Sequence, residues 1–563
     1  MKNIIRLNHL MFLLLAIIAG VGCKKDFLER PPQDTVVDVN FYKTNEQILA
    51  GTALLYSKVW FDYNDKAMYN LGDFRGGTAY SPWNDRGNVL FNTTGDNGEN
   101  GASWRAFFNV VAQSNLAIYN INKYAGEAVS PNIKKFAIAE ARFMRALAYR
   151  FLVMNWGEVP VIESNIDHLN DTSIRKNTVK SVWRFITREM RAAAEDMPET
   201  PIQEGRLTKW SAEGMLARFY LTRAGVDANG TTRKQEFLDS AKYYAARVIN
   251  NSGRKLLTNY EDLFKFPYDN NSESLFELQW VFSGPVSAPG VWGTQNSMPE
   301  YLAYSPDISF GGWGGDKGAT WWLMKQYDGI VLQANGTLKG RTLDKRLKPT
   351  FMLPGFFYPE ITMMSGVKLT FPFTGTDFNY LNVKKYVIGS PKDLAGIAAQ
   401  QAYPNNTYMM RLAEMYLVYA EAALGNAATL TDATGIQYFN KIRERAGLAP
   451  LADGSGNPRP ITFDDIFSER MKEFAMEGMA WYDMVTIHYY DPSKAYGILN
   501  SQDRGLFFTK PDQMPNPTEW TFTKTSWFGE RTIVANSGNF RLPIPNAELS
   551  QAPNLSLPAV DYP

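Results

Sequence analysis

Two glycine-rich segments place aromatic residues next to short polar ones, and these segments hold the residues best suited to bind a ligand. Aromatic residues make up 14% of the chain. The faces of Trp and Tyr can stack on the apolar C–H faces of a sugar ring, while Asn, Asp and Arg can bond to its hydroxyls. The first group is Asp73, Arg75, Tyr80, Trp83, Asn84 and Asp85, and the second group is Trp292, Asn296, Tyr301, Tyr304 and Trp313.

The alternative for each of these rings is a place in the core, because large aromatic side chains are usually buried. Trp321 and Trp322 begin what reads as a short helix, and we expect one of them to be a core residue. The ligand-binding interpretation therefore requires that rings of the two groups reach the surface.

Residue types that support catalysis form no recognisable pattern. The three histidines, His9, His168 and His488, are far apart in the sequence and make no close pair of metal ligands. The chain has no GxSxG nucleophile motif, and the glycines at 311–315 lack the Lys-Ser/Thr that completes a phosphate-binding loop. The sequence therefore predicts a binding protein without enzyme activity, and it indicates no cofactor and no metal site.

A surface glycoside hydrolase stays as a weaker alternative, since such an enzyme needs only two carboxylates across a cleft. The chain has 57 acidic residues, among which such a pair could lie. Glu140, Glu421 and Glu473, however, occur in helices rich in apolar residues. We expect these three to pair with arginines and to stabilise helix packing.

The N-terminus predicts export and lipid attachment. Lys2 and Arg6 precede the apolar run 11–18, which is too short to span a bilayer, and small residues then lead to Cys23. Cys23 is the only cysteine, so it cannot form a disulfide within the chain. We expect cleavage after residue 22, acylation of Cys23 and an extended tether over 23–40, although Gly20 stands where bacterial lipoproteins usually carry Leu.

Composition is that of a large soluble body. The 563 residues are 45% hydrophobic, and a chain of this length can bury a substantial core. The 58 basic and 57 acidic residues give a net charge of +1. This balance lacks the positive excess that nucleic-acid binding depends on, so no such partner is expected.

Apolar residues at three- and four-residue spacings predict a mostly α-helical fold. Small residues recur on the helix faces and favour close packing of helix pairs. From about 256 to 406, glycine, proline and asparagine instead favour loops with short strands. We therefore expect one globular domain over 41–563, with helical parts at 41–255 and 407–490, an irregular ligand-binding insertion at 256–406 and a loop-rich tail at 491–563. The expected helices begin after a Thr44 cap and near Ser103, and then cover 134–155, 179–194, 211–223, 237–250, 409–424, 434–446 and 463–485.

A series of sequence blocks carries a more specific signal. They are EARFMRALAY at 140–149, NWGEVP at 155–160, GRLTKWSA at 205–212, LARFYL at 216–221, RLAEMYLVYAEA at 411–422, NKIRERA at 440–446, Glu469-Arg470, EFAMEG at 473–478, WYD at 481–483 and LPIP at 542–545. In this order, from Cys23 to the C-terminus, the chain resembles the SusD/RagB family of outer-membrane nutrient-binding lipoproteins. It departs from the family at Met479 and Thr486, where arginines are usual, and in its loose final segment 554–562; the two replacements put local ion pairs in doubt.

The resemblance implies a fold of tetratricopeptide-like helix pairs that carries an irregular ligand-binding part. It also implies a place on the outward face of a Bacteroidetes-type outer membrane, anchored by lipid at Cys23. Asp26 and Glu29 look like the surface-export signal of such lipoproteins. There the chain would cover a SusC-like TonB-dependent transporter, capture oligosaccharides and deliver them for polysaccharide utilisation. A peptide-binding lid of RagB type is the alternative, which the aromatic loops disfavour only mildly.

Changing Cys23 to Ala should remove the acylation site and release the protein from membranes. The expected result is a shift of the protein from the membrane pellet to the soluble fraction, measured in cells that lack the transporter partner. Multiple acyl chains would otherwise hold it firmly. A variant that pellets with outer membranes as the unmodified chain does would show that lipid at Cys23 is not the anchor.

Overall fold

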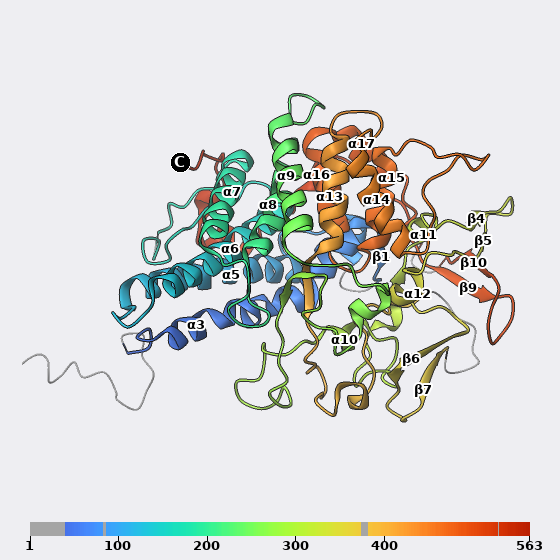
Figure 1. The fold of residues 1–563 in the computed structure, drawn as a ribbon, viewed down its shortest axis with the longest axis horizontal. Helices are drawn as coiled ribbons and strands as arrows, with labels where there is room; N and C mark the ends of the chain where they lie inside the picture. The colour runs from blue at the N-terminus through green and yellow to red at the C-terminus, as the bar shows by residue number, and fades with distance from the viewer. Residues whose placement is uncertain (1–39, 83–85, 170, 373–380, 527–528) are drawn as a thin grey trace, which may run out of the picture.

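The computed structural model describes residues 40–82, 86–169, 171–372, 381–526 and 529–563. Cys23 and its tether lie outside these residues. The helices of the two ends of the chain gather on one side, and the loops and strands of the middle segment lie beside them (Figure 1). In the described ranges no helix has both the length and the apolar character needed to cross a bilayer.

The first half of the chain folds as consecutive packed helices. Thr44 closes a capping box on the first helix, as its sequence position predicts. In the helix Pro131–Trp156, every residue from 143 to 156 is buried because neighbouring elements cover several of its sides. Gly157 (φ +75°) ends this helix. The helices are α3 (Asn45–Ala53), α5 (Gly98–Tyr124), α6 (Pro131–Trp156), α7 (Val179–Asp196), α8 (Lys209–Val226) and α9 (Gln235–Asn251), and α5 to α9 each pack against the next.

The C-terminal helices continue the same layer. The first of them packs on α9, so two parts of the chain separated by the middle segment form one helical body (Figure 1). These helices are α13 (Leu412–Leu424), α14 (Ala433–Arg445), α15 (Phe463–Glu473), α16 (Ala480–Tyr490) and α17 (Pro492–Asn500). The mostly helical fold class is confirmed.

Two predicted helices are corrected. Met409 to Arg411 belong to a strand, and the helix begins only at Leu412. The helix expected over 463–485 is broken at 474–479, where Met476 and Gly478 both have positive φ values. In addition, α17 lies in the tail that was expected to be rich in loops.

Strands in the described ranges form small antiparallel sheets. Strands β2 (Ser274–Leu278) and β8 (Thr407–Arg411) pair and are buried at all ten positions, so the two ends of the middle segment meet inside the molecule. The remaining strands form a sheet in the order β4-β5-β10-β9 and two further pairs. Their bounds are β1 (Ala79–Tyr80), β3 (Gly318–Ala319), β4 (Ile330–Leu332), β5 (Leu338–Gly340), β6 (Phe356–Thr362), β7 (Lys368–Phe371), β9 (Phe507–Pro511) and β10 (Trp520–Lys524).

Short helical segments complete the description. Two of them, η3 and η4, are consecutive π-helical turns, a form that is rare elsewhere and frequent at functional sites. The segments are η1 (Leu54–Tyr56), η2 (Lys58–Trp60), η3 (Tyr63–Ala67), η4 (Tyr69–Phe74), α4 (Arg86–Leu90), η5 (Tyr260–Phe264), α10 (Met298–Leu302), η6 (Gly314–Asp316), α11 (Trp321–Met324), α12 (Leu347–Thr350), η7 (Pro391–Leu394), η8 (Ser537–Phe540), α18 (Asn546–Gln551) and η9 (Pro553–Ser556).

A network of buried ion pairs joins the middle segment to the C-terminal helices. Arg411, at the end of β8, contacts Glu273 at 2.9 Å, Glu473 at 2.5 Å and Glu477 at 2.8 Å. Glu473 also pairs with Arg445 and, at 3.1 Å, with Arg346. Burial alone would raise the pKa of Glu473, but the three arginines hold that pKa well below its ordinary value.

The expectation that Glu140, Glu421 and Glu473 pair with arginines is confirmed. Glu140 lies 2.9 Å from Arg206, and Glu421 lies 2.8 Å from Arg233. Tyr56 and Thr52 also donate hydrogen bonds to Glu140. All three carboxylates are therefore occupied within the helical body.

Glu473→Ala should destabilise the protein by about 3–5 kcal/mol, because it leaves buried arginines without their carboxylate. The matched control is Glu519→Ala, which removes an exposed pair with Lys339 at 2.6 Å and should cost less than about 1 kcal/mol. Denaturant unfolding of the two variants measures the difference. Equal losses would contradict the structural role of the network.

Candidate functional site

The first predicted group lies inside the molecule as far as it is described. Asp73 is fully buried, Arg75 is 2% exposed and Tyr80 is 1% exposed. Trp83, Asn84 and Asp85 lie outside the described residues. The prediction that Asp73 and Arg75 bond to ligand hydroxyls is corrected, because both side chains are occupied within the protein.

Asp73 closes the turn that separates α15 from α16. Its carboxylate accepts hydrogen bonds from the backbone N–H groups of Met476 and Gly478, each at 2.8 Å, and from the hydroxyl of Thr78 at 2.7 Å. Burial raises the pKa of Asp73 to about 6, although these bonds favour the charged form. The side chain therefore links η4 to the broken helix, which explains both its burial and the break.

Arg75 is held between two aromatic rings. Its guanidinium carbon lies 4.4 Å from the ring centre of Trp481 and 4.7 Å from that of Phe91. It donates a hydrogen bond to the carbonyl of Asn539, and burial lowers its pKa to about 9. Arg75 thus serves packing between the N-terminal turns and the C-terminal tail.

The second predicted group divides into surface and buried members. Trp292 is 52% exposed and Trp313 is 50% exposed. Asn296 is fully buried: it donates to the carbonyl of Asn405 and accepts from Asn64 and from the N–H of Met298. The prediction that Asn296 contacts ligand is therefore also corrected, and the two tryptophans are the members that reach solvent.

The two tyrosines pack beneath this surface. Tyr301, on α10, is 6% exposed and stacks on Tyr69 of η4 with ring centres 6.4 Å apart. Lys317 places its ammonium 4.4 Å from the ring centre of Tyr301. Tyr304 is partly buried and meets Phe371 edge-on at 5.5 Å. Trp321 and Trp322 are both buried, whereas only one of them was expected to be a core residue.

Both exposed tryptophans flank α10, one on each side along the chain. Trp292 meets Phe61 edge-on with ring centres 5.1 Å apart, so one edge is supported and part of the ring stays open. Asn64 of η3 donates a hydrogen bond to Asn296, which follows Trp292 in the chain. Thr407 in turn donates to Asn64 at 2.7 Å. The π-helical turns, α10 and the end of the middle segment thus form a rigid base beneath Trp292.

Glu300 holds the loop that carries Trp313. Its carbonyl accepts a hydrogen bond from the N–H of Trp313 at 3.0 Å, and its carboxylate accepts one from the N–H of Gln401 at 2.6 Å. Gly312 has a φ of +55°, and a Cβ there would lie 2.1 Å from the Ser305 carbonyl carbon. Only glycine fits this turn. The glycines were predicted from the sequence, but Glu300 was not, because no local sequence pattern distinguishes it from other glutamates.

This arrangement can stack on flat apolar faces but offers little acid–base chemistry at the exposed rings. Glu300, whose carbonyl accepts from the N–H of Trp313, is fully buried, and Asp316 on the same loop pairs with Lys317 at 3.1 Å. In the described ranges, no group of three or more His, Cys, Asp or Glu residues is placed to hold a metal ion. The two exposed rings are placed so that a flat apolar face could stack on them.

Comparison with known proteins gives the family. Residues 272–557 match the model of the SusD family, and residues 26–221 match a second model described as "Starch-binding associating with outer membrane". A SusD-like protein of Bacteroides ovatus is 36% identical over 575 aligned residues, covering 99% of this chain and 98% of that protein.

Solved structures agree. A crystal structure of a protein with a xylogluco-oligosaccharide is 34% identical, with a TM-score of 0.78, and the match covers 92% of this chain and 99% of that one. Another crystal structure is 35% identical with a TM-score of 0.80, covering 93% and 99% of the two chains. On its sequence blocks, its fold and these matches, the chain belongs to the SusD family.

Proposed function

We propose that the chain is a cell-surface glycan-binding lipoprotein without catalytic activity, and that Trp292 and Trp313 stack on the sugar rings of its ligand. The observation that carries the proposal is the half-exposure of these two rings on loops that flank a rigid base. A sugar offers apolar C–H faces that match such rings. The complex of a 34% identical protein with a xylogluco-oligosaccharide supports this ligand class.

Export and anchoring complete the proposal. The acylated Cys23 would hold the chain on the outward face of the outer membrane, and the helical body would pack on a SusC-like TonB-dependent transporter. The family description "Starch-binding associating with outer membrane" supports the location. Captured oligosaccharide would then pass from Trp292 and Trp313 into the transporter.

Trp313→Ala and Trp292→Ala should each weaken oligosaccharide binding by about tenfold, which corresponds to roughly 1.4 kcal/mol. Melting temperatures should stay nearly unchanged, because half of each ring is already in solvent. Calorimetry with a xylogluco-oligosaccharide measures the affinity, with laminari- and malto-oligosaccharides as further probes.

Tyr243→Ala is the matched control, since Tyr243 is 56% exposed on α9, within the helical body. It should bind as the unmodified protein does. If both tryptophan variants bind every oligosaccharide normally, the rings are not the site. Peptide binding in place of oligosaccharide binding would favour the RagB-type alternative.

Glu300 acts in this proposal as a positioning residue for Trp313. Glu300→Ala should weaken binding by up to about tenfold, because the loop at Gln401 loses the carboxylate that its N–H bonds to, and this carboxylate also packs against Gly311 of the Trp313 loop. The backbone carbonyl that accepts from Trp313 is kept in this variant. Glu300→Gln should restore binding to within about threefold, since an amide oxygen can accept the same hydrogen bond from Gln401. Loss of binding in both variants would contradict the positioning role and implicate the charge itself.

A further inference from the structure

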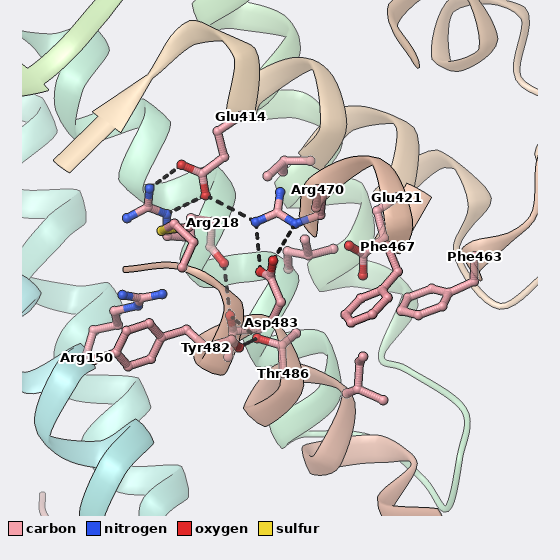
Figure 2. A pocket seen from close by; sticks show the side chains of 15 residues that line it. Arg150, Arg218, Glu414, Glu421, Phe463, Phe467, Arg470, Tyr482, Asp483 and Thr486 are labelled. Atoms are coloured by element: carbon pink, nitrogen blue, oxygen red, sulfur yellow. Dashed lines mark hydrogen bonds and ion pairs between the residues drawn. The ribbon is translucent and has the colours of Figure 1, made fainter. Parts of the chain in front are cut away.

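A small cavity, partly open to solvent, lies where five helices of the two halves meet, and neither Trp292 nor Trp313 lines it. It has a volume of about 20 Å³, and its walls come from α6, α8, α13, α15 and α16 (Figure 2). About 10–15 Å³ of this kind of space holds one water molecule. Met479 and Thr486 line the cavity, and neither carries a charge.

Each carboxylate on the cavity wall already has an arginine of its own. Arg218 binds both oxygens of Glu414, with Nε 2.7 Å from one of them. Arg470 binds both oxygens of Asp483, at 2.8 and 2.9 Å. Figure 2 draws these contacts as dashed lines. Glu421, the third carboxylate, pairs with Arg233.

Arg150 forms no ion pair with a carboxylate among the described residues. It is 3% exposed, and its Nε and Nη1 atoms are buried without a hydrogen-bond acceptor in the described part of the chain. Its guanidinium carbon lies 4.2 Å from the ring centre of Tyr482, which Figure 2 draws beside it. The same carbon lies 4.9 Å from the ring centre of Phe151. The rings attract the cation but accept none of its in-plane N–H groups.

The absence of acceptors for the Arg150 N–H groups is energetically unfavourable. A buried donor without an acceptor destabilises the folded protein, and more so when the group is charged. Arg218 lies close enough to lower the pKa of Arg150, after burial itself, to about 10. The wall itself carries Arg150, Arg218 and Arg470 against Glu414, Glu421 and Asp483. Glu421 is already paired with Arg233 from outside the wall, so these four arginines exceed the three carboxylates by one positive charge, although Glu414 also attracts Arg150.

We propose that the cavity binds a single small monovalent anion of halide size on the N–H groups of Arg150. One negative charge balances the unpaired guanidinium and supplies the missing hydrogen-bond acceptor. The space suits one small particle of this kind. Leu221, Val418 and Ile487 form apolar parts of the wall, which favours an anion that loses its hydration easily over a strongly hydrated one.

Crystals of the unmodified protein grown in sodium bromide test the site directly. The anomalous signal of bromide should give a peak inside the cavity, within about 3.5 Å of a nitrogen of Arg150. An ordered water in the cavity with no anomalous peak would overturn the proposal and leave solvent as the acceptor. A bromide peak only at the protein surface would overturn it equally.

A solution measurement adds a second readout. At constant ionic strength, replacing gluconate by 200 mM chloride should raise the melting temperature by about 1–3 °C, because binding to the folded state stabilises it. Arg150→Met should abolish this rise, while Arg184→Met, which removes an exposed arginine of α7, should preserve it. A rise that persists in Arg150→Met would show that chloride acts elsewhere.

Discussion

The pairing of buried charge is the constraint on which the rest of the structure depends. Arg411 and Glu473 sit at the centre of a network whose members come from the strand pair β2–β8, from α14 and α15, and from the loop before α12. A buried charge without a partner is far more costly than a paired one, so the network tolerates only one arrangement of these elements. It thereby fixes the irregular middle segment against the helical layer, although few regular strands connect them.

The proposed binding residues take their position from that arrangement. The middle segment carries α10 and both exposed tryptophans, and it returns to the helices through Thr407 and Arg411. Buried amides carry the connection further, since Asn296 joins Asn64 of η3 to the loop at Asn405. Glu300 then ties two surface loops to α10. Rings that remain half-exposed can hold a defined orientation because the hydrogen bonds of Asn296 and Glu300 fix the loops that carry them.

The sequence predicted the helices well because their apolar spacing, caps and terminal glycines are local signals. Thr44 and Gly157 act as their residue types suggest. Arginine partners for Glu140, Glu421 and Glu473 could also be expected, because a carboxylate in an apolar helix needs a counter-charge. The break after Glu473 could not be, since it depends on Asp73, which lies 403 residues before Met476 in the chain.

The candidate site was predictable only in part, for a related reason. Glycine-rich loops with Trp and Asn indicate a binding surface, but they do not say which side chains face solvent. Trp292 and Trp313 reach it, whereas Asp73, Arg75 and Asn296 are used to hold distant segments together. In the sequence, a polar residue beside an aromatic one looks the same whether it binds ligand or holds distant segments together. Only long-range contacts distinguish these two roles.

In the proposed function, sugar rings lie on Trp292 and Trp313 and are bound without being cleaved. The decisive experiment is a crystal structure of the protein grown with a xylogluco-oligosaccharide. We expect an intact oligosaccharide with at least one sugar ring parallel to each indole face. Density for the oligosaccharide at a different surface, or for a shortened cleavage product, would contradict it.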